Sequence, residues 1–213
     1  GHDEVREVFA QRADTMKAPI IFADEQNEVI THRLSADEQH LIYHSWHFGE
    51  IQGQLTGDCQ PANTRTVLEA VKVLRGGGYE ISDEHVHQGF AHVCDLTGLM
   101  GRWQTLRRSP RVLCDTGHNV GGITYIARSL QRSTRQQLHI VLGMVNDKDI
   151  NHVLELLPPH ATYYFTQASV KRAMPVDEFA HIAEAHGLHG TLYPTVRQAY
   201  EAALSAAAPD DLI

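Results

Sequence analysis

Residues 111–122 read Arg-Val-Leu-Cys-Asp-Thr-Gly-His-Asn-Val-Gly-Gly, and this stretch decides the fold of the carboxy-terminal half of the chain. Its first residues form a short apolar run that predicts a strand, and an acid, a histidine and an amide follow at once. Gly121 and Gly122 then predict the opening of a helix, whose amino end favours anions. A strand that leads through polar residues into a helix is typical of a ligand site at the carboxyl edge of a parallel sheet.

Strand and helix patterns alternate from this stretch onward. Short apolar runs predict strands at 111–115, 137–142, 162–166 and 190–193, and amphipathic patterns predict helices at 121–132, 149–157, 176–186 and 196–208. Such alternation produces βαβ crossovers, so we expect an α/β fold with a Rossmann-like, mostly parallel sheet and helices on both faces. The closing Asp210-Asp211-Leu212-Ile213 predicts the start of a final strand that is truncated.

The residues before this part give a mixed pattern. We expect helices over 3–16 and 64–75, a helix from Ser82 to about Gly98, a strand over 19–23, an extended segment over 46–55, and loops over 32–40 and 57–63. The triple glycine at 76–78 predicts the end of a helix, since it lacks the lysine and hydroxyl of a phosphate loop. We place the boundary near Thr97–Met100, which divides the chain into residues 1–98 and 99–213.

Composition narrows the class of protein. The formal net charge of −8 disfavours a nucleic-acid or anionic-membrane partner, although Arg102, Arg107, Arg108 and Arg111 form a local basic group. No apolar run approaches the roughly 20 residues of a membrane span, and no signal peptide is recognisable. The three cysteines form no CxxC pair, which favours a reduced, cytoplasmic compartment.

Three residues of the carboxy-terminal part are the main candidates for chemistry. Asp115 ends a strand, where a carboxylate commonly binds ribose hydroxyls, and His118 follows in the turn; the alternative is that Asp115 only caps the next helix. Arg102, in Gly-Arg-Trp-Gln, suits phosphate oxygens. Its alternative role is that of a surface arginine in a linker, with Trp103 filling a gap between domains.

Other polar groups leave their role open. Asn63 is either a binding residue or the N-cap of the following helix, and the Asn-Asp-Lys-Asp at 146–149 is either a ligand loop or a polar turn. His40, His44 and His47 would share one face of a helix, but the sequence predicts no strong helix there and no zinc-ligand pattern. We therefore expect no metal site. No GxGxxG follows a strand, which disfavours a nicotinamide dehydrogenase.

A series of motifs in order resembles folylpolyglutamate synthase/dihydrofolate synthase, in the Mur-ligase superfamily. The motifs are Leu-Thr-Gly-Asp-Cys-Gln-Pro-Ala-Asn at 55–63, Gly-Arg-Trp-Gln at 101–104, Asp-Thr-Gly-His-Asn-Val-Gly-Gly at 115–122 and Leu-Gly-Met-Val-Asn-Asp-Lys-Asp at 142–149. The resemblance implies that residues 1–98 are the carboxy-terminal remnant of the central ATPase domain. Residues 99–213 would then be the carboxy-terminal Rossmann-like domain.

The resemblance also implies a reaction and its site. Such enzymes use ATP and Mg²⁺ to activate a folate or dihydropteroate carboxylate as an acyl phosphate, which L-glutamate then attacks. Asn63 matches the residue that contacts adenine, Arg102 the one that reaches the phosphates, Asp115 the acid that engages the nucleotide, and His118 a histidine near the reacting groups.

The chain departs from the family pattern in ways that affect activity. The P-loop, its lysine and the magnesium ligands are absent, which indicates an excised piece whose partner is the missing amino-terminal ATPase domain and which is inactive alone. The Gly-Ser that usually follows the final strand is also absent. Two alternatives stay open: another Mur-type amino-acid ligase, and a non-catalytic nucleotide-binding or interaction domain.

Overall fold

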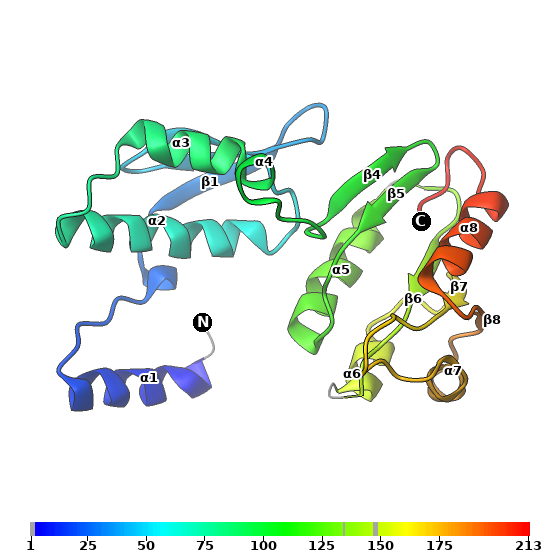
Figure 1. Cartoon of the computed structure of the whole chain (residues 1–213). Helices are drawn as coiled ribbons and strands as arrows, with labels where there is room; N and C mark the ends of the chain where they lie inside the picture. The colour runs from blue at the N-terminus through cyan, green and yellow to red at the C-terminus, as the bar shows by residue number, and fades with distance from the viewer. Residues whose placement is uncertain (1–2, 134, 147–148) are drawn as a thin grey trace. The chain divides into compact units, whose positions relative to one another are not determined.

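The computed structural model describes residues 3–133, 135–146 and 149–213, and it divides into two compact units, Gly1–Leu99 and Met100–Ile213 (Figure 1). This division lies one residue after the boundary expected between residues 98 and 99. No helix among the described residues is long and apolar enough to cross a membrane. No two cysteines in this part of the chain form a disulfide.

The first unit is built on a three-stranded antiparallel sheet of β1 (Val29–Leu34), β2 (Leu41–Ser45) and β3 (Gly49–Gly53), with β2 in the middle. The loop expected over 32–40 is therefore wrong for its first residues, because Leu34 pairs with Leu41 and closes a hairpin. The extended segment expected over 46–55 is confirmed only for β3, since residues between Ser45 and Gly49 turn the chain.

The α-helices among the described residues of this unit are α1 (Asp3–Met16), α2 (Gln60–Gly76), α3 (Asp83–Ala91) and α4 (Val93–Thr97). The loop expected over 57–63 is wrong from Gln60 onward, because Pro61 is compatible with the first turn of a helix. The triple glycine ends α2 as expected, with Gly78 at φ +92°. The helix expected from Ser82 is confirmed at its start, where the Ser82 hydroxyl accepts the His85 N–H at 3.1 Å and caps α3.

The strand expected over 19–23 is wrong. Ile20 and Ile21 are exposed, and Ala23 begins a single 3-10 turn, η1 (Ala23–Glu25). A short apolar run becomes a strand only where a neighbouring strand supplies its backbone partners, and no strand of the described chain pairs with these residues. The core of the unit lies instead between the sheet and the helices α2 and α3, and consists of Leu41, Tyr43, Phe48, Ile51, Leu68 and Val86.

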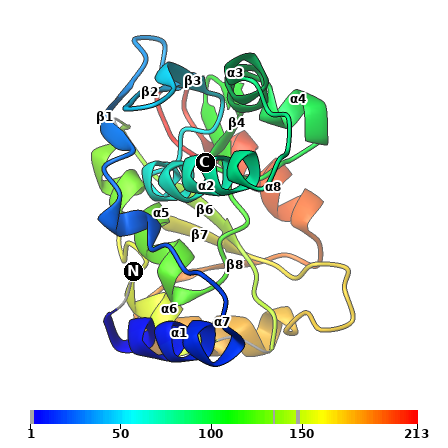
Figure 2. The same cartoon turned by 90° about the vertical axis from the view of Figure 1, so that its left-hand side faces the viewer.

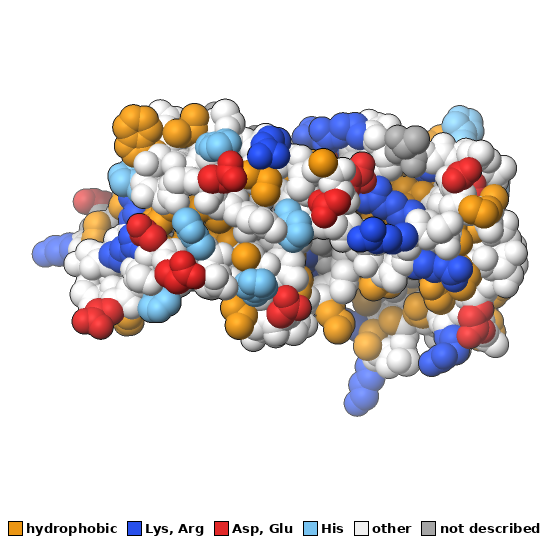
Figure 3. Space-filling model, turned by 90° about the horizontal axis from the view of Figure 1, so that it is seen from above, with side chains coloured by type: hydrophobic (Ala, Val, Ile, Leu, Met, Phe, Trp, Pro, Cys, Tyr) orange, Lys and Arg blue, Asp and Glu red, His pale blue; other side chains and the backbone are white. Residues whose placement is uncertain are grey.

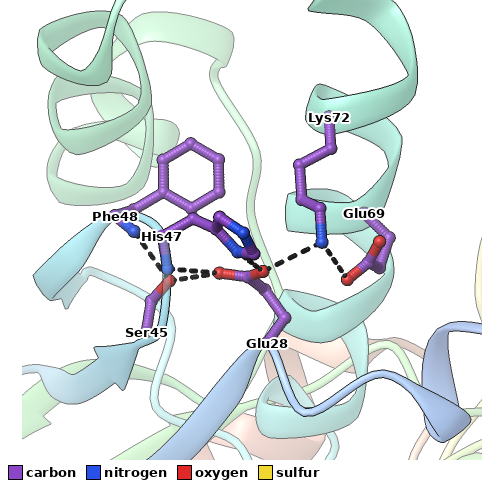
Figure 4. Close-up of polar contacts among 6 residues, drawn as sticks. All are labelled: Glu28, Ser45, His47, Phe48, Glu69 and Lys72. Atoms are coloured by element: carbon purple, nitrogen blue, oxygen red, sulfur yellow. Dashed lines mark hydrogen bonds and ion pairs between the residues drawn. The ribbon is translucent and has the colours of Figure 1, made fainter. Parts of the chain in front are cut away.

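A charged cluster is buried beside this core (Figure 4). The side chain of Glu28 is fully buried, and its Oε1 accepts the Ser45 hydroxyl at 2.5 Å. Its Oε2 accepts Lys72 Nζ at 3.2 Å and lies 2.6 Å from His47 Nδ1. Lys72 also donates to Glu69 at 2.9 Å. Burial opposes ionisation of Glu28, but the hydrogen bonds from these donors hold its pKa below the usual range.

The second unit contains the expected parallel sheet, formed by β6 (His139–Leu142), β7 (Thr162–Phe165) and β8 (Gly190–Leu192) in that order (Figure 2). Its helices are α5 (Val120–Arg132), α6 (Ile150–Glu155), α7 (Val176–Ala185) and α8 (Val196–Ala206). Successive β7 residues face opposite ways. Tyr163 and Phe165 pack in one cluster with α5, α6 and α7, whereas Tyr164 packs with α8. Helices on both faces of the sheet are thus confirmed.

An antiparallel hairpin of β4 (Gln104–Arg108) and β5 (Arg111–Cys114) precedes the parallel strands. The strand β4 was not expected. The last residues of the chain lie between β5 and β6, because Leu212 forms parallel bridges to both Arg111 and Leu138. The expected start of a final strand is therefore present at this central position, and it connects the hairpin to the parallel sheet.

The Asp211 carboxylate holds the last residues of the chain in place through hydrogen bonds. It accepts the N–H of Ala208 at 2.7 Å and that of Gln137 at 2.9 Å, and it lies 3.3 Å from His139 Nε2. These contacts, the backbone bond from Ala208 above all, hold the pKa of Asp211 below its usual range. The acid pair before Leu212 is thus part of how the segment enters the sheet.

Candidate functional site

The register of the hairpin brings the two main motifs together. Gln104 pairs with Cys114, so the residues just before β4 lie beside the residues just after β5. The residues between Arg102 and Asp115 in the sequence form the β4–β5 hairpin. Its antiparallel pairing places Arg102 next to Asp115.

The Asp115 carboxylate joins the two segments. Its Oδ2 accepts the backbone N–H of Trp103 at 2.7 Å, and its Oδ1 accepts the N–H of Gly117 at 2.7 Å. The alternative that Asp115 caps the next helix is wrong, because Asn119 is the N-cap of α5 and accepts the Gly122 N–H at 2.8 Å. Asp115 is exposed, and each of its oxygens keeps a further lone pair for a ligand.

The turn at 101–103 has a demanding backbone. Gly101 has φ +68° and Trp103 has φ +51°, both in the left-handed region. A Cβ at position 101 would lie 2.5 Å from Cγ2 of Thr116, so only glycine fits there. The indole of Trp103 packs against Leu130, Leu138 and Leu212 within the second unit.

Arg102 is exposed at this turn, and its Nη1 donates to the carbonyl of Gly101 at 3.2 Å and to the hydroxyl of Thr116. The other arginines of the basic group lie at the far end of the hairpin, where Arg108 pairs with Arg111. The strand β4 separates the turn that holds Arg102 from Arg108. Figure 3 shows basic side chains gathered on one face of the second unit. Arg102 therefore lies apart from the arginines of the hairpin tip.

His118 is exposed and has a defined orientation. Its Nδ1 lies 2.9 Å from the carbonyl oxygen of Thr116. A carbonyl can only accept, so Nδ1 carries the hydrogen, and in the neutral ring Nε2 is left as the acceptor. The neighbouring Cys114 is a poor nucleophile, because burial and the charge of Asp115 raise the pKa of its thiol.

Asn63 belongs to the first unit, whereas Arg102, Asp115 and His118 belong to the second. Its alternative role as an N-cap is wrong, because α2 begins at Gln60 and Asn63 lies within the first turn. The Asn63 side chain is exposed and donates to Gln60 Oε1 at 3.3 Å. It lines a cavity of about 320 Å³ between α2, α3 and β3, whose walls are mainly apolar.

A second cavity, of about 370 Å³, has Asp115, Gly117 and Trp103 on its wall. Most of its lining is apolar and comes from the strands β5 and β6, the helix α5 and the last residues of the chain. This lining continues the core cluster of Leu130, Leu138 and Leu212. The cavity suits apolar packing rather than phosphate, so the candidate site is the exposed surface over Arg102, Asp115 and His118.

His40, His44 and His47 do not lie on a helix. His44 lies in β2, 3.5 Å from Glu50, and His47 follows in the turn beside Glu28. Figure 3 shows histidine side chains spread over the surface of the first unit. Within residues 3–133, 135–146 and 149–213 no three His, Cys, Asp or Glu side chains are grouped so that they could hold a metal ion.

Asn146 and Asp149 of the polar stretch at 146–149 are among the described residues. Asp149 is the N-cap of α6 and lies 2.6 Å from His152 Nδ1, which supports the polar-turn interpretation for that residue. Asp147 and Lys148 lie outside the described residues. Sequence reasoning missed Thr116, which contacts Arg102; its only signal was its place beside Asp115 in the motif.

A family model for the Mur ligase, glutamate ligase domain matches residues 101–213, and this chain belongs to that family. Its curated relatives include the dihydrofolate synthase/folylpolyglutamate synthase of Escherichia coli, which is 28% identical over 176 residues, or 80% of this chain and 39% of the relative. The enzyme of the same name from Mycobacterium tuberculosis is 28% identical over 137 residues. The chain thus spans less than half the length of these relatives.

Solved structures agree with this assignment. The Mycobacterium tuberculosis folylpolyglutamate synthase complexed with ADP matches with a TM-score of 0.79 and 25% identity, over 95% of this chain and 45% of that protein. A bifunctional folylpolyglutamate synthase/dihydrofolate synthase from Yersinia pestis matches with a TM-score of 0.65 at 21% identity, which shows the fold alone.

Proposed function

We propose that this chain is the carboxy-terminal portion of an ATP-dependent folate ligase, which adds L-glutamate to a folate or dihydropteroate carboxylate. The observation that carries the proposal is the joining of the Arg102 turn to Asp115 at the carboxyl end of β5, within the residues matched by the family. The names of the curated relatives and the ADP bound to the Mycobacterium tuberculosis enzyme support it.

Each site residue has a role that its surroundings support. The guanidinium of Arg102 would bind the ATP phosphates as a planar, permanent cation. Asp115 already accepts two backbone N–H groups, and its remaining lone pairs would accept hydroxyl groups of the nucleotide. Asn63 would contact the adenine through its exposed amide, and His118 would lie near the reacting groups with Nε2 as acceptor.

The proposed reaction is amide ligation in two displacements. The substrate carboxylate attacks the γ-phosphorus of ATP, so that ADP leaves and an acyl phosphate forms. The glutamate amine then attacks the acyl carbon, loses a proton and expels inorganic phosphate. Arg102 would stabilise negative charge that develops on the transferred phosphoryl group.

The rest of the machinery would come from elsewhere in the full enzyme. The described residues offer no cluster of metal ligands, so the Mg²⁺ of the reaction would be held by the amino-terminal ATPase domain. That domain is the proposed partner of this chain, and the isolated chain would bind nucleotide weakly and be inactive. The absence of disulfides among the described residues supports a reducing, cytoplasmic setting.

The test is an assay of phosphate release that depends on both glutamate and folate. We would join the chain to the amino-terminal half of a folylpolyglutamate synthase and compare it with the isolated chain. Activity should appear only in the joined enzyme, and Arg102→Ala and Asp115→Ala should each raise the KM for ATP roughly tenfold or more. Full activity in both variants would contradict the site, and activity only with a cell-wall precursor would favour another Mur-type ligase.

A further inference from the structure

Thr116 holds the side chain of Arg102 through its hydroxyl. Arg102 Nη1 donates to Thr116 Oγ1, and the same hydroxyl donates to the Gly101 carbonyl at 3.1 Å. The backbone N–H of Thr116 also donates to the Gly101 carbonyl, at 2.9 Å. Arg102 Nη1 lies 3.2 Å from that carbonyl. The guanidinium, the hydroxyl and the Gly101 carbonyl thus form one closed set of contacts.

A threonine hydroxyl fits this position for a chemical reason. It has one hydrogen to donate and two lone pairs to accept with. Because its hydrogen is directed to Gly101, a lone pair is left facing the guanidinium. The threonine methyl is fixed as well, since it lies against the Gly101 backbone where a Cβ would come within 2.5 Å of it.

The contacts with Gly101 and Thr116 leave the Nε–Nη2 edge of the Arg102 guanidinium able to bind an anion. Both anchoring contacts use Nη1, and no partner for Nε or Nη2 is found among the described residues. The Nε and Nη2 hydrogens point the same way and form the pair that binds two oxygens of one anion. An arginine held in this way loses less side-chain freedom when an anion binds.

We propose that Thr116 is a positioning residue, which orients the guanidinium of Arg102 so that its Nε–Nη2 edge binds a phosphate group of the nucleotide. The proposal rests on the proposed function, because it takes the anion to be that of ATP. It assigns to Thr116 a role through Arg102 and not through any contact with the substrate.

The test uses the full-length enzyme with its amino-terminal half in place. Thr116→Val removes the hydroxyl and keeps the shape, and we expect a rise in the KM for ATP of roughly tenfold, the effect of losing one hydrogen bond to a charged group. The KM for glutamate and the melting temperature should stay unchanged. Thr116→Ser keeps the hydroxyl and should restore most of the affinity for ATP.

Two controls separate positioning from a structural effect. Thr124→Val makes the same chemical change on α5, where the hydroxyl donates only to the Val120 carbonyl of its own helix, and should leave every parameter unchanged. In an Arg102→Ala background, Thr116→Val should have no further effect on the KM for ATP, because the group that it positions is gone.

The outcomes distinguish this proposal from the one on which it rests. If Arg102→Ala raises the KM for ATP while Thr116→Val does not, or if Thr116→Ser is no better than valine, the positioning role is wrong and the proposed function stands. If Arg102→Ala leaves the KM for ATP unchanged, the assignment of Arg102 fails and the role of Thr116 fails with it.

Discussion

Two polar clusters, the Glu28 cluster of the first unit and the Arg102–Asp115 cluster of the second, differ in how many of their hydrogen-bonding groups already have partners. In the first unit the carboxylate of Glu28 is buried and surrounded by donors from β2, the following turn and α2 (Figure 4). In the second unit Asp115 and Arg102 are exposed; each Asp115 oxygen accepts a single backbone N–H, and the hydrogen bonds of Arg102 use Nη1. A buried cluster whose hydrogen-bonding groups all have partners can contribute to folding but not to binding. An exposed cluster that keeps unused donors and acceptors can also bind a ligand.

The largest effect should come from breaking the buried cluster. Lys72→Met leaves the Glu28 charge buried without its cation, and we expect a loss of about 2 to 3 kcal/mol in the free energy of unfolding, below the full cost because Lys72 is partly exposed. Urea titration followed by circular dichroism measures this loss. Lys171→Met, at an exposed position, is the control. Equal stability of the two variants would mean that the cluster does not hold the first unit together.

The same cluster should make the first unit sensitive to acid. Because the pKa of Glu28 is lowered by folding, its contribution to stability is complete above its ordinary pKa of 4.5 and is lost as the pH falls through the lower folded value. Glu28→Gln has no charge to lose there, so its free energy of unfolding should fall less steeply over this acid range. Urea titrations at a series of pH values compare the two. If the free energy of unfolding falls equally steeply with acid in both proteins, the pKa of Glu28 is not shifted by folding.

Asp115 tests the other half of the comparison. Asp115→Asn turns one acceptor oxygen into a donor that faces a backbone N–H, so we expect about 1 to 2 kcal/mol of lost stability together with a loss of ATP affinity. Asp37→Asn is a matched control, since Asp37 also accepts a backbone N–H in an exposed turn, from Gln39 at 3.1 Å. The control should leave ATP binding, measured by calorimetry in the joined enzyme described under the proposed function, unchanged. An unaltered ATP affinity in Asp115→Asn would reduce Asp115 to a structural role.

The sequence predicts some secondary-structure elements of the two units better than others. Helical periodicity and short apolar runs were enough to predict α2, α5, α7 and α8 and the parallel strands, because the helices have regular apolar spacing and each apolar run has a neighbouring strand to pair with. The hairpin strand β4 was missed, since Gln-Thr-Leu-Arg-Arg carries no apolar alternation and its outer residues are exposed. That strand sets the register which places Arg102 beside Asp115.

Tertiary contacts explain the remaining differences. Nothing in the sequence around Glu28 predicts that its side chain is buried in a polar cluster. Its partners come from β2 and from Lys72, which lies 44 residues further on in α2. It also permits a strand over 19–23, which fails for want of a neighbouring strand among the described residues. Candidate residues can therefore be named from motifs, whereas the donors that surround them depend on strand register and helix packing.

The smallest effect on stability should come from Asp149 and His152, which form a hydrogen-bonded pair at the surface. This pair tests whether the stability that the Glu28 cluster provides depends on burial or on pairing alone. The hydrogen bond that the His152 ring donates to the Asp149 carboxylate raises the pKa of His152, and the pair lies at the surface, where Asp149 caps α6. A raised histidine pKa stabilises the fold below the ordinary value of 6.5, and the effect is lost as the pH rises through the higher folded value. In Asp149→Leu the NMR titration of His152 should return toward its ordinary pKa, while the urea midpoint should move far less than in Lys72→Met. A midpoint shift as large as that of Lys72→Met would show that pairing alone, without burial, accounts for the stability of such clusters.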